Sequence, residues 1–217
     1  IMAGDWSSDV CSSDLKDGDM DSRDILTIKG LIRRGEARTA SSYNNIPLDR
    51  VHFLDLPFYE TGKIQKNPIS EADVEIVRNL LREIKPHQIF VAGDLADPHG
   101  THRVCTDAVF AAVDLEKEEG AKWLKDCRIW MYRGAWAEWE IENIEMAVPI
   151  SPEELRAKRN SILKHQSQME SAPFLGNDER LFWQRSEDRN RGTATLYDQL
   201  GLASYEAMEA FVEYIPL

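Results

Sequence analysis

Two histidines in one short segment are the side chains of this sequence best suited to chemistry. His99 and His102 lie three positions apart within residues 93–103, which read GDLADPHGTHR. On the first turn of a helix, this spacing places both imidazoles on one face. The positive end of the helix dipole disfavours imidazolium, so it keeps histidines there in the neutral form that binds a metal. The segment is therefore a candidate metal site.

Two aspartates in the same segment leave its role open. Asp94 and Asp97 could bind a metal directly, orient a metal-binding histidine, or cap the following helix. In the simpler interpretation Asp97 is only the cap, and both histidines bind backbone carbonyl groups. Catalytic zinc normally has three protein ligands, so two histidines do not complete a site. The spacing alone supports both interpretations.

The elements on either side indicate where this segment lies in the fold. Residues 88–93 (QIFVAG) form a short β-branched and aromatic run that ends in glycine, which is typical of a buried, central parallel strand. Val104, Ala108, Ala111 and Leu115 then recur with helical spacing. Open α/β sheets bind ligands at the turn that follows such a strand.

Strand and helix patterns alternate along the rest of the chain. Helices are predicted over 21–40, from Ser70 to Pro86 and from Ser151 to about 165, and strands over 51–54, 129–132, 144–148 and, at an edge of the sheet, 211–215. This alternation predicts an α/β fold: a three-layer α/β/α Rossmann-like sandwich with a mostly parallel sheet.

Composition excludes several classes of protein. The 217 residues carry a net charge of −12, which argues against nucleic acid and anionic membranes as partners. No apolar run approaches the roughly 20 residues that span a bilayer. Three cysteines are too few for a disulfide framework, so we expect a protein of the reducing cytoplasm.

The first residues stand apart from the rest. Residues 5–15 (DWSSDVCSSDL) have no helical or strand period and resemble one translated reading frame of a sequencing-library adapter. We therefore expect residues 1–15 to be an artefact and residues 16–217 to be an N-terminally truncated domain, without its first strand and first active-site loop.

Four short motifs, in order over residues 23–168, resemble the PIG-L/LmbE-like zinc N-deacetylases. Residues 99–102 (HGTH) resemble the H-x-x-H motif of that family, and residues 33–37 (RRGEA) resemble its early R-x-x-E helix. Residues 51–57 (VHFLDLP) are similar to the strand after that helix, and residues 158–168 (KRNSILKHQSQ) to a C-terminal signature ending in His-x-Ser-Gln. The amino-acid sequence of residues 93–105 and 159–191 resembles that of one subgroup of the family. This subgroup is the domain fused behind glucosamine-6-phosphate deaminase/isomerase in bacterial two-domain proteins.

The resemblance implies a hydrolase that removes the acetyl group from an N-acetylglucosamine-type sugar in amino-sugar metabolism, with an amino sugar or sugar phosphate as substrate. It implies His102 as a zinc ligand, His99 as the group that assists proton transfer or stabilises the oxyanion, and Arg33 as a contact to sugar hydroxyls. The family takes its other ligands and its aspartate base from a His-Pro-Asp-Asp motif, which this sequence lacks.

The intact parent is therefore expected to bind Zn²⁺, whereas this chain is expected neither to hold zinc stably nor to catalyse. The alternative is a non-catalytic interaction or regulatory domain attached to the deaminase. The pattern does not indicate an oligomeric state.

Four further side chains have two interpretations each. Arg133 could bind a phosphate or form a surface salt bridge. The tryptophans of residues 134–139 could stack on a sugar ring or anchor a lid. His165 is expected to hold the C-terminal signature against the site loop rather than to act chemically.

Overall fold

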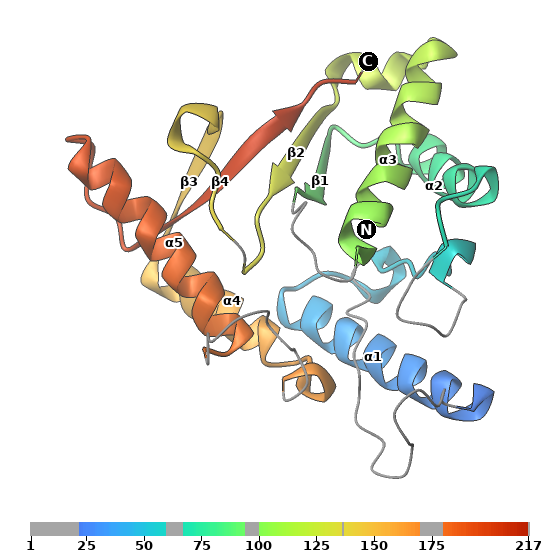
Figure 1. Cartoon of the computed structure of the whole chain (residues 1–217), viewed down its shortest axis with the longest axis horizontal. Helices are drawn as coiled ribbons and strands as arrows, with labels where there is room; N and C mark the ends of the chain where they lie inside the picture. The colour runs from blue at the N-terminus through green and yellow to red at the C-terminus, as the bar shows by residue number, and fades with distance from the viewer. Residues whose placement is uncertain (1–21, 60–66, 94–99, 136, 170–179, 217) are drawn as a thin grey trace.

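The structure is a computed structural model of the chain, and it describes residues 22–59, 67–93, 100–135, 137–169 and 180–216 (Figure 1). Its helices and strands follow in the order α1 (Arg23–Tyr43), α2 (Glu71–Ile84), β1 (Gln88–Ala92), α3 (Thr101–Glu118), β2 (Arg128–Tyr132), β3 (Met146–Ile150), α4 (Pro152–Ile162), α5 (Phe182–Gln199) and β4 (Ala207–Tyr214). The alternation of strands and helices predicted from the sequence is present, and the fold is α/β.

The strands form one sheet in the order β1-β2-β4-β3. β1 runs parallel to β2, whereas β4 runs antiparallel to both β2 and β3. β1, β2 and β3 therefore point in the same direction, and β4 alone is reversed between two of them. The carboxyl ends of β1 and β2 consequently meet at one edge of the sheet, where the candidate segment begins.

Helices cover the two faces of this sheet, which makes three layers (Figure 1). Successive residues of a strand point to opposite faces, so Tyr214 and Glu209 of β4 lie on different sides. The Tyr214 ring stacks on Phe110 of α3, with 3.6 Å between the ring centroids. Glu209 instead accepts hydrogen bonds from Lys158 of α4 and from Arg189 of α5.

The main hydrophobic core lies between the sheet and the α2/α3 layer. Its most deeply buried members come from both helices and from β2: Val77, Leu81, Ala108, Ala112, Val113 and Ile129. Burying a side chain of the size of Leu or Ile stabilises the fold by about 1.5–3 kcal/mol, so this layer fixes α3 firmly on the sheet.

Helix starts were predicted well because capping is a local property. The Ser70 hydroxyl accepts from the Asp73 amide, and the Asp73 carboxylate accepts from the Ser70 amide, which is the predicted capping box of α2. Ser151 and Glu154 form the same reciprocal pair at the start of α4, with Pro152 in the first turn.

The predicted strand at residues 51–54 is wrong. These residues pair with no strand in the described part of the chain, although Val51 has extended backbone angles. The guanidinium groups of Arg34 and Arg38 instead lie over the Phe53 ring, each 5.4 Å from the ring centroid. An extended, apolar segment becomes a strand only where a neighbouring strand supplies hydrogen-bond partners.

Three details of the sheet also differ from the prediction. Among the described strands β1 is an edge strand and not a central one, because it pairs with β2 alone. The last strand, predicted at the edge over 211–215, is β4 and lies between β2 and β3. β3 begins at Met146, two residues later than predicted, and ends at Ile150.

Helix α1 forms as predicted but leaves its apolar side chains in solvent. Ile25, Ile28, Leu31 and Ile32 are all exposed, Ile28 to 56% and Leu31 to 62%. α1 packs through its polar residues and its C-terminal end instead. Within the described ranges, none of the helices combines the length and apolar character that a membrane-spanning helix needs.

Candidate functional site

The candidate segment lies at the predicted position in the fold, between the carboxyl end of β1 and the start of α3. Gly100, with φ of 69°, precedes the first helical residue and contributes no side-chain cap. His102 is the second residue of α3 and is partly buried. His99, Asp94 and Asp97 lie outside the described residues, so whether the two imidazoles share a face stays a prediction.

The chain on both sides of this segment is firmly held. The Ala92 carbonyl, at the end of β1, accepts a hydrogen bond of 2.7 Å from Thr106 Oγ1 of α3. The Gly93 amide donates to the Tyr132 carbonyl at 2.8 Å, which extends the β1–β2 ladder by one residue. The core contacts of α3 and these two bonds fix the end of the strand and the beginning of the helix.

Arg133 adopts an arrangement that neither sequence interpretation anticipated. Its Nη1 donates to the Gly93 carbonyl oxygen at 3.0 Å, and its guanidinium carbon lies 4.2 Å from the centroid of the Trp139 ring. The guanidinium therefore joins the end of β1 to the loop after β2. A contact from Arg133 to substrate stays a prediction. Trp136, the other tryptophan of that loop, lies outside the described residues.

The R-x-x-E helix and the His-x-Ser-Gln segment meet in space, although 131 residues separate them. The Glu36 carboxylate accepts from both the amide and the hydroxyl of Ser167, each at 2.7 Å. Burial lowers the pKa of His165 below its usual value, and the nearby Glu36 carboxylate offsets part of that shift. The structure thus brings together two motifs that the sequence analysis could associate only by resemblance. Arg33 lies on the same helix, and its predicted contact to sugar hydroxyls stays a prediction.

A buried polar network was missed by the sequence analysis. Arg189 of α5, with only 4% of its side chain exposed, donates to Glu138 at 2.6 Å, to the Gly134 carbonyl at 2.8 Å and to Glu209. Lys158 of α4 donates to Glu209 at 2.6 Å and to Asn190 at 2.7 Å. The one available signal was Glu209, which interrupts a run of small and apolar residues in the last strand.

Charge and burial oppose each other in this network. Burial favours the neutral carboxyl of Glu209, but Lys158 and Arg189 outweigh it and hold the pKa of Glu209 below its usual value. Burial also lowers the pKa of Lys158, and Glu209 offsets only part of that shift. The network ties the loop after β2 to α4, α5 and β4, and that loop carries Trp139.

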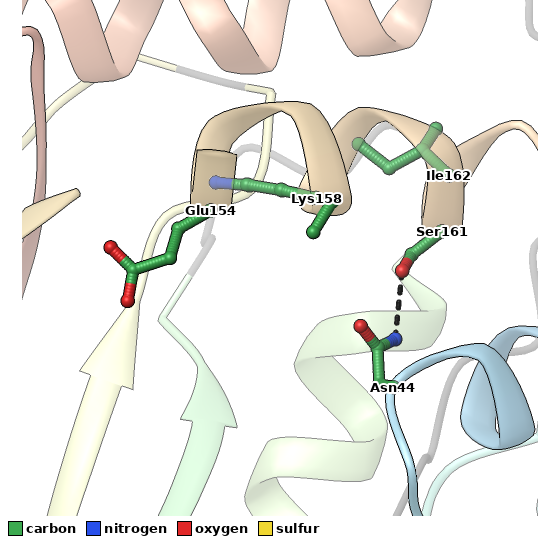
Figure 2. Close-up of a pocket in the computed structure, with 6 residues that line it drawn as sticks. Asn44, Glu154, Lys158, Ser161 and Ile162 are labelled. Carbon is green, nitrogen blue, oxygen red and sulfur yellow. Dashed lines mark hydrogen bonds between the residues drawn. The ribbon is translucent and has the colours of Figure 1, made fainter. Parts of the chain in front are cut away.

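An open hollow of about 420 Å³ lies elsewhere, where the end of α1 meets α4 (Figure 2). Asn44 Nδ2 donates to Ser161 Oγ at 2.7 Å across it, and Glu154, Ala157, Lys158 and Ile162 line the rest. Figure 2 shows the Lys158 amine pointing away from Asn44. The hollow is a junction between two helices, and none of its described lining residues belongs to the candidate segment.

The described residues do not supply a full set of metal ligands. No group of three His, Cys, Asp or Glu side chains among them is placed to hold a metal ion. A catalytic zinc normally needs three protein ligands, and the described part contributes one candidate, His102. The donor set in view therefore does not fit a catalytic zinc by itself.

Comparison with known proteins identifies the family and the fold. The sequence matches PIG-L, described as GlcNAc-PI de-N-acetylase, over residues 5–113, a range that includes the segment resembling an adapter. Among solved structures it is similar to GalB, the 4-carboxy-2-hydroxymuconate hydratase from Pseudomonas putida KT2440, with a TM-score of 0.57 and 14% identity over 86% of this chain and 72% of that chain.

Two further structures have the same fold. The conserved protein TT1542 from Thermus thermophilus has a TM-score of 0.54 and 18% identity, over 92% of this chain and 77% of that chain. The N,N'-diacetylchitobiose deacetylase from Pyrococcus horikoshii has a TM-score of 0.50 and 17% identity, over 86% of this chain and 64% of that chain. At such identities the structures establish the fold alone, whereas the family match covers half of the sequence. The chain belongs to the PIG-L (GlcNAc-PI de-N-acetylase) family.

Proposed function

We propose that this domain belongs to a zinc-dependent hydrolase that removes the acetyl group from an N-acetylglucosamine-type sugar. The observation that carries the proposal is the position of His102, on the first turn of α3 directly behind β1, in a chain that matches a de-N-acetylase family. The diacetylchitobiose deacetylase, which shares the fold, acts on an N-acetylated sugar as its name states, and so supports the substrate class.

In this proposal each candidate residue has one role. His102 would be a ligand of the metal, and His99 would assist proton transfer or stabilise the developing oxyanion. Arg33 would hold sugar hydroxyls, and Asp94 and Asp97 would bind the metal or orient the histidines, since the N-cap position of α3 is Gly100. Bound zinc would supply a Lewis acid for the amide carbonyl and lower the pKa of the attacking water.

We also propose that the 217-residue chain does not catalyse this reaction alone and does not hold zinc stably. The sequence contains no His-Pro-Asp-Asp motif, which the family uses for further ligands and for the aspartate base. One assigned ligand with a neighbouring histidine would bind zinc weakly, and water would have no carboxylate as its proton acceptor.

The parent is proposed to carry this domain behind a glucosamine-6-phosphate deaminase/isomerase domain, in amino-sugar metabolism. The basis is the amino-acid sequence of residues 93–105 and 159–191, which resembles the PIG-L domains fused to such deaminases. Cys105 and Cys127 are both free thiols, which agrees with a reducing, cytoplasmic compartment. A bacterial source is proposed from the same subgroup resemblance.

Two other functions compete with this proposal. GalB, named as a hydratase, has the same fold, so the fold does not by itself select amide hydrolysis. The domain could also be an interaction module that kept the fold without the chemistry. Gly100 and Thr101 stand where the family usually has Pro-Asp, which is the observation that favours this second candidate.

The test uses the uninterrupted reading frame from the genome, with acetate release measured from N-acetylglucosamine and from its 6-phosphate. We expect zinc-dependent release that is abolished by His102→Ala and retained by His87→Ala, which changes an exposed histidine in the turn before β1. An upstream sequence without His-Pro-Asp-Asp, or release that His102→Ala leaves unchanged, would favour the interaction module and contradict the proposal.

A further inference from the structure

Gly93, which directly follows β1 and is the first residue of the candidate segment, is unusually crowded. A Cβ atom at Gly93 would lie 2.6 Å from Cζ2 of Trp139 and 2.8 Å from Cβ of Met131. Real Cβ atoms do not approach other atoms so closely, so only glycine lets the Trp139 ring reach the backbone here. The need is for space, because Gly93 is not among the residues with positive φ.

Both backbone polar groups of Gly93 are also held. Its amide donates to the Tyr132 carbonyl at 2.8 Å, and its carbonyl accepts from Arg133 Nη1 at 3.0 Å. The Arg133 guanidinium lies on the Trp139 ring, 4.2 Å from its centroid, a distance typical of a cation–π contact. Gly93, Arg133 and Trp139 therefore contact one another in every pairing, and we call these three residues the Gly93 latch.

The Gly93 latch is joined to the buried polar network around Arg189. Trp139 adjoins Glu138, whose carboxylate accepts from Arg189 at 2.6 Å and from Thr193 Oγ1 at 2.6 Å. Arg189 also donates to the carbonyl of Gly134, next to Arg133. Side chains fixed in this way hold a site more precisely than a free loop does.

We propose that Arg133 and Trp139 are positioning residues, which hold Gly93 at the carboxyl end of β1 in a fixed place relative to the first turns of α3. The Thr106 hydroxyl of α3 donates to the carbonyl of Ala92, the residue before Gly93, so the chain that the latch holds is also bonded to the helix that carries His102. The role rests on the proposed function only in that His102 is taken as part of the site. A displaced Gly93 would move the Ala92 carbonyl and disturb its bond to α3, and outer contacts of this kind affect metal sites strongly.

The test compares Arg133→Met and Arg133→Lys with Arg128→Met, which changes an exposed arginine at the first residue of β2, the strand that Arg133 follows. The readout is the imidazole ¹H–¹⁵N spectrum of the metal-free chain at one fixed pH. We expect Arg133→Met to shift the His102 signals and to leave those of His87 in place. Arg133→Lys should restore the His102 signals in part, and Arg128→Met should leave them unchanged.

A purely structural role would lower the melting temperature without moving the His102 signals, and that result would overturn the proposal. If Arg133→Met does not fold, Arg133→Lys and Trp139→Phe decide the question by the same signals. Zinc titration of the same samples forms a separate arm, in which Arg133→Met is expected to weaken binding about 10-fold. Wild-type His102 signals that do not respond even to a large excess of zinc would contradict the assignment of His102 as a zinc ligand, while the metal-free spectra would still test the latch.

Discussion

Arg189 is the residue whose charge is most completely removed from solvent among those that hold the loop after β2. Its guanidinium is satisfied on all sides, by Glu138, by Glu209 and by the Gly134 carbonyl. A buried pair of this kind adds little net stability when compared with apolar residues, but the loss of one partner leaves unpaired charges in a poorly hydrated place.

Arg189→Met is therefore expected to lower the free energy of unfolding by about 3–5 kcal/mol, because Glu138 loses its guanidinium partner and Glu209 keeps only Lys158 of the two cations that it binds. Urea unfolding followed by circular dichroism measures the change. The matched control is Arg191→Met on the same helix, where an exposed arginine pairs with Glu206 and is worth about 0–1 kcal/mol. Equal effects of the two substitutions would contradict the buried network.

The Asp73 carboxylate links folding to pH. Burial by itself would raise the pKa of Asp73, but hydrogen bonds from the Ser70 hydroxyl and from the Phe58 and Ser70 amides lower it below 3.8. A carboxyl with a lowered folded pKa stabilises the protein fully above its unfolded pKa, and this contribution disappears as the pH falls through the folded pKa.

Asp73→Asn is accordingly expected to destabilise the fold by about 1.5–3 kcal/mol at pH 7, the range for hydrogen bonds to a charged group. The difference from wild type should persist down to about pH 4 and shrink below it, because wild-type Asp73 then becomes protonated. Urea unfolding at a series of pH values measures this. A difference that stays constant as the pH falls well below about 4 would show that the charge of Asp73 is not what stabilises the cap.

Sequence reasoning at the level of single residues predicted where His102 lies in the fold, but it did not predict the contacts around the candidate segment. The H-x-x-H spacing and the strand before it placed His102 correctly on the first turn of α3. The partners of Arg133 could not be predicted, because only the fold brings them to it. They are the Gly93 carbonyl, forty residues away, and the Trp139 ring, six residues away. Glu209 and Arg189 were missed for the same reason.

Two helices with similar patterns show the limit of periodicity at the level of elements. α2 and α1 both carry an apolar stripe, yet Val77 and Leu81 of α2 are buried, while Ile28 and Leu31 of α1 are exposed. Periodicity predicts that a helix has an apolar face. It does not say whether the rest of the molecule covers that face.

The contrast predicts opposite results for two substitutions. Leu31→Gln is expected to change the free energy of unfolding by no more than about 0.5 kcal/mol, as for an exposed position. Leu81→Ala, at a fully buried position of α2, should cost about 2–5 kcal/mol. Urea unfolding of both variants measures these values. A loss above about 2 kcal/mol for Leu31→Gln would show that the apolar face of α1 is covered in solution.

The sequence predicted the positions of strands that have clear local patterns. It did not predict which strands pair with each other. β1 and β2 have the β-branched and aromatic runs that indicate buried strands, and both formed close to their predicted bounds. The place of β4 between β2 and β3 depends on contacts across the whole chain. Residues 51–54 have strand-like composition but no neighbour to pair with in the described part.

At the scale of the whole molecule, the sheet and its two helical layers place the described part of the candidate segment beyond the carboxyl end of β1, and the family match supports our proposal that the chemistry takes place there. The α/β class followed from the alternation of patterns, and the family followed from four short motifs. The identity of residues 5–15 as adapter sequence, the fusion to a deaminase domain and the role of zinc stay predictions, and the first two are checked by reading the uninterrupted gene.

The most direct test of the account is calorimetric titration of Zn²⁺ into the 217-residue chain and into its His102→Ala variant, with acetate release from N-acetylglucosamine measured on the same samples. We predict weak binding by the chain, weaker binding by the variant, and no acetate release from either, because the sequence contains no His-Pro-Asp-Asp motif to supply the further ligands and the base that a catalytic zinc requires. Tight binding of one zinc per chain, with acetate release that His102→Ala abolishes, would show a complete site within these residues and contradict the account.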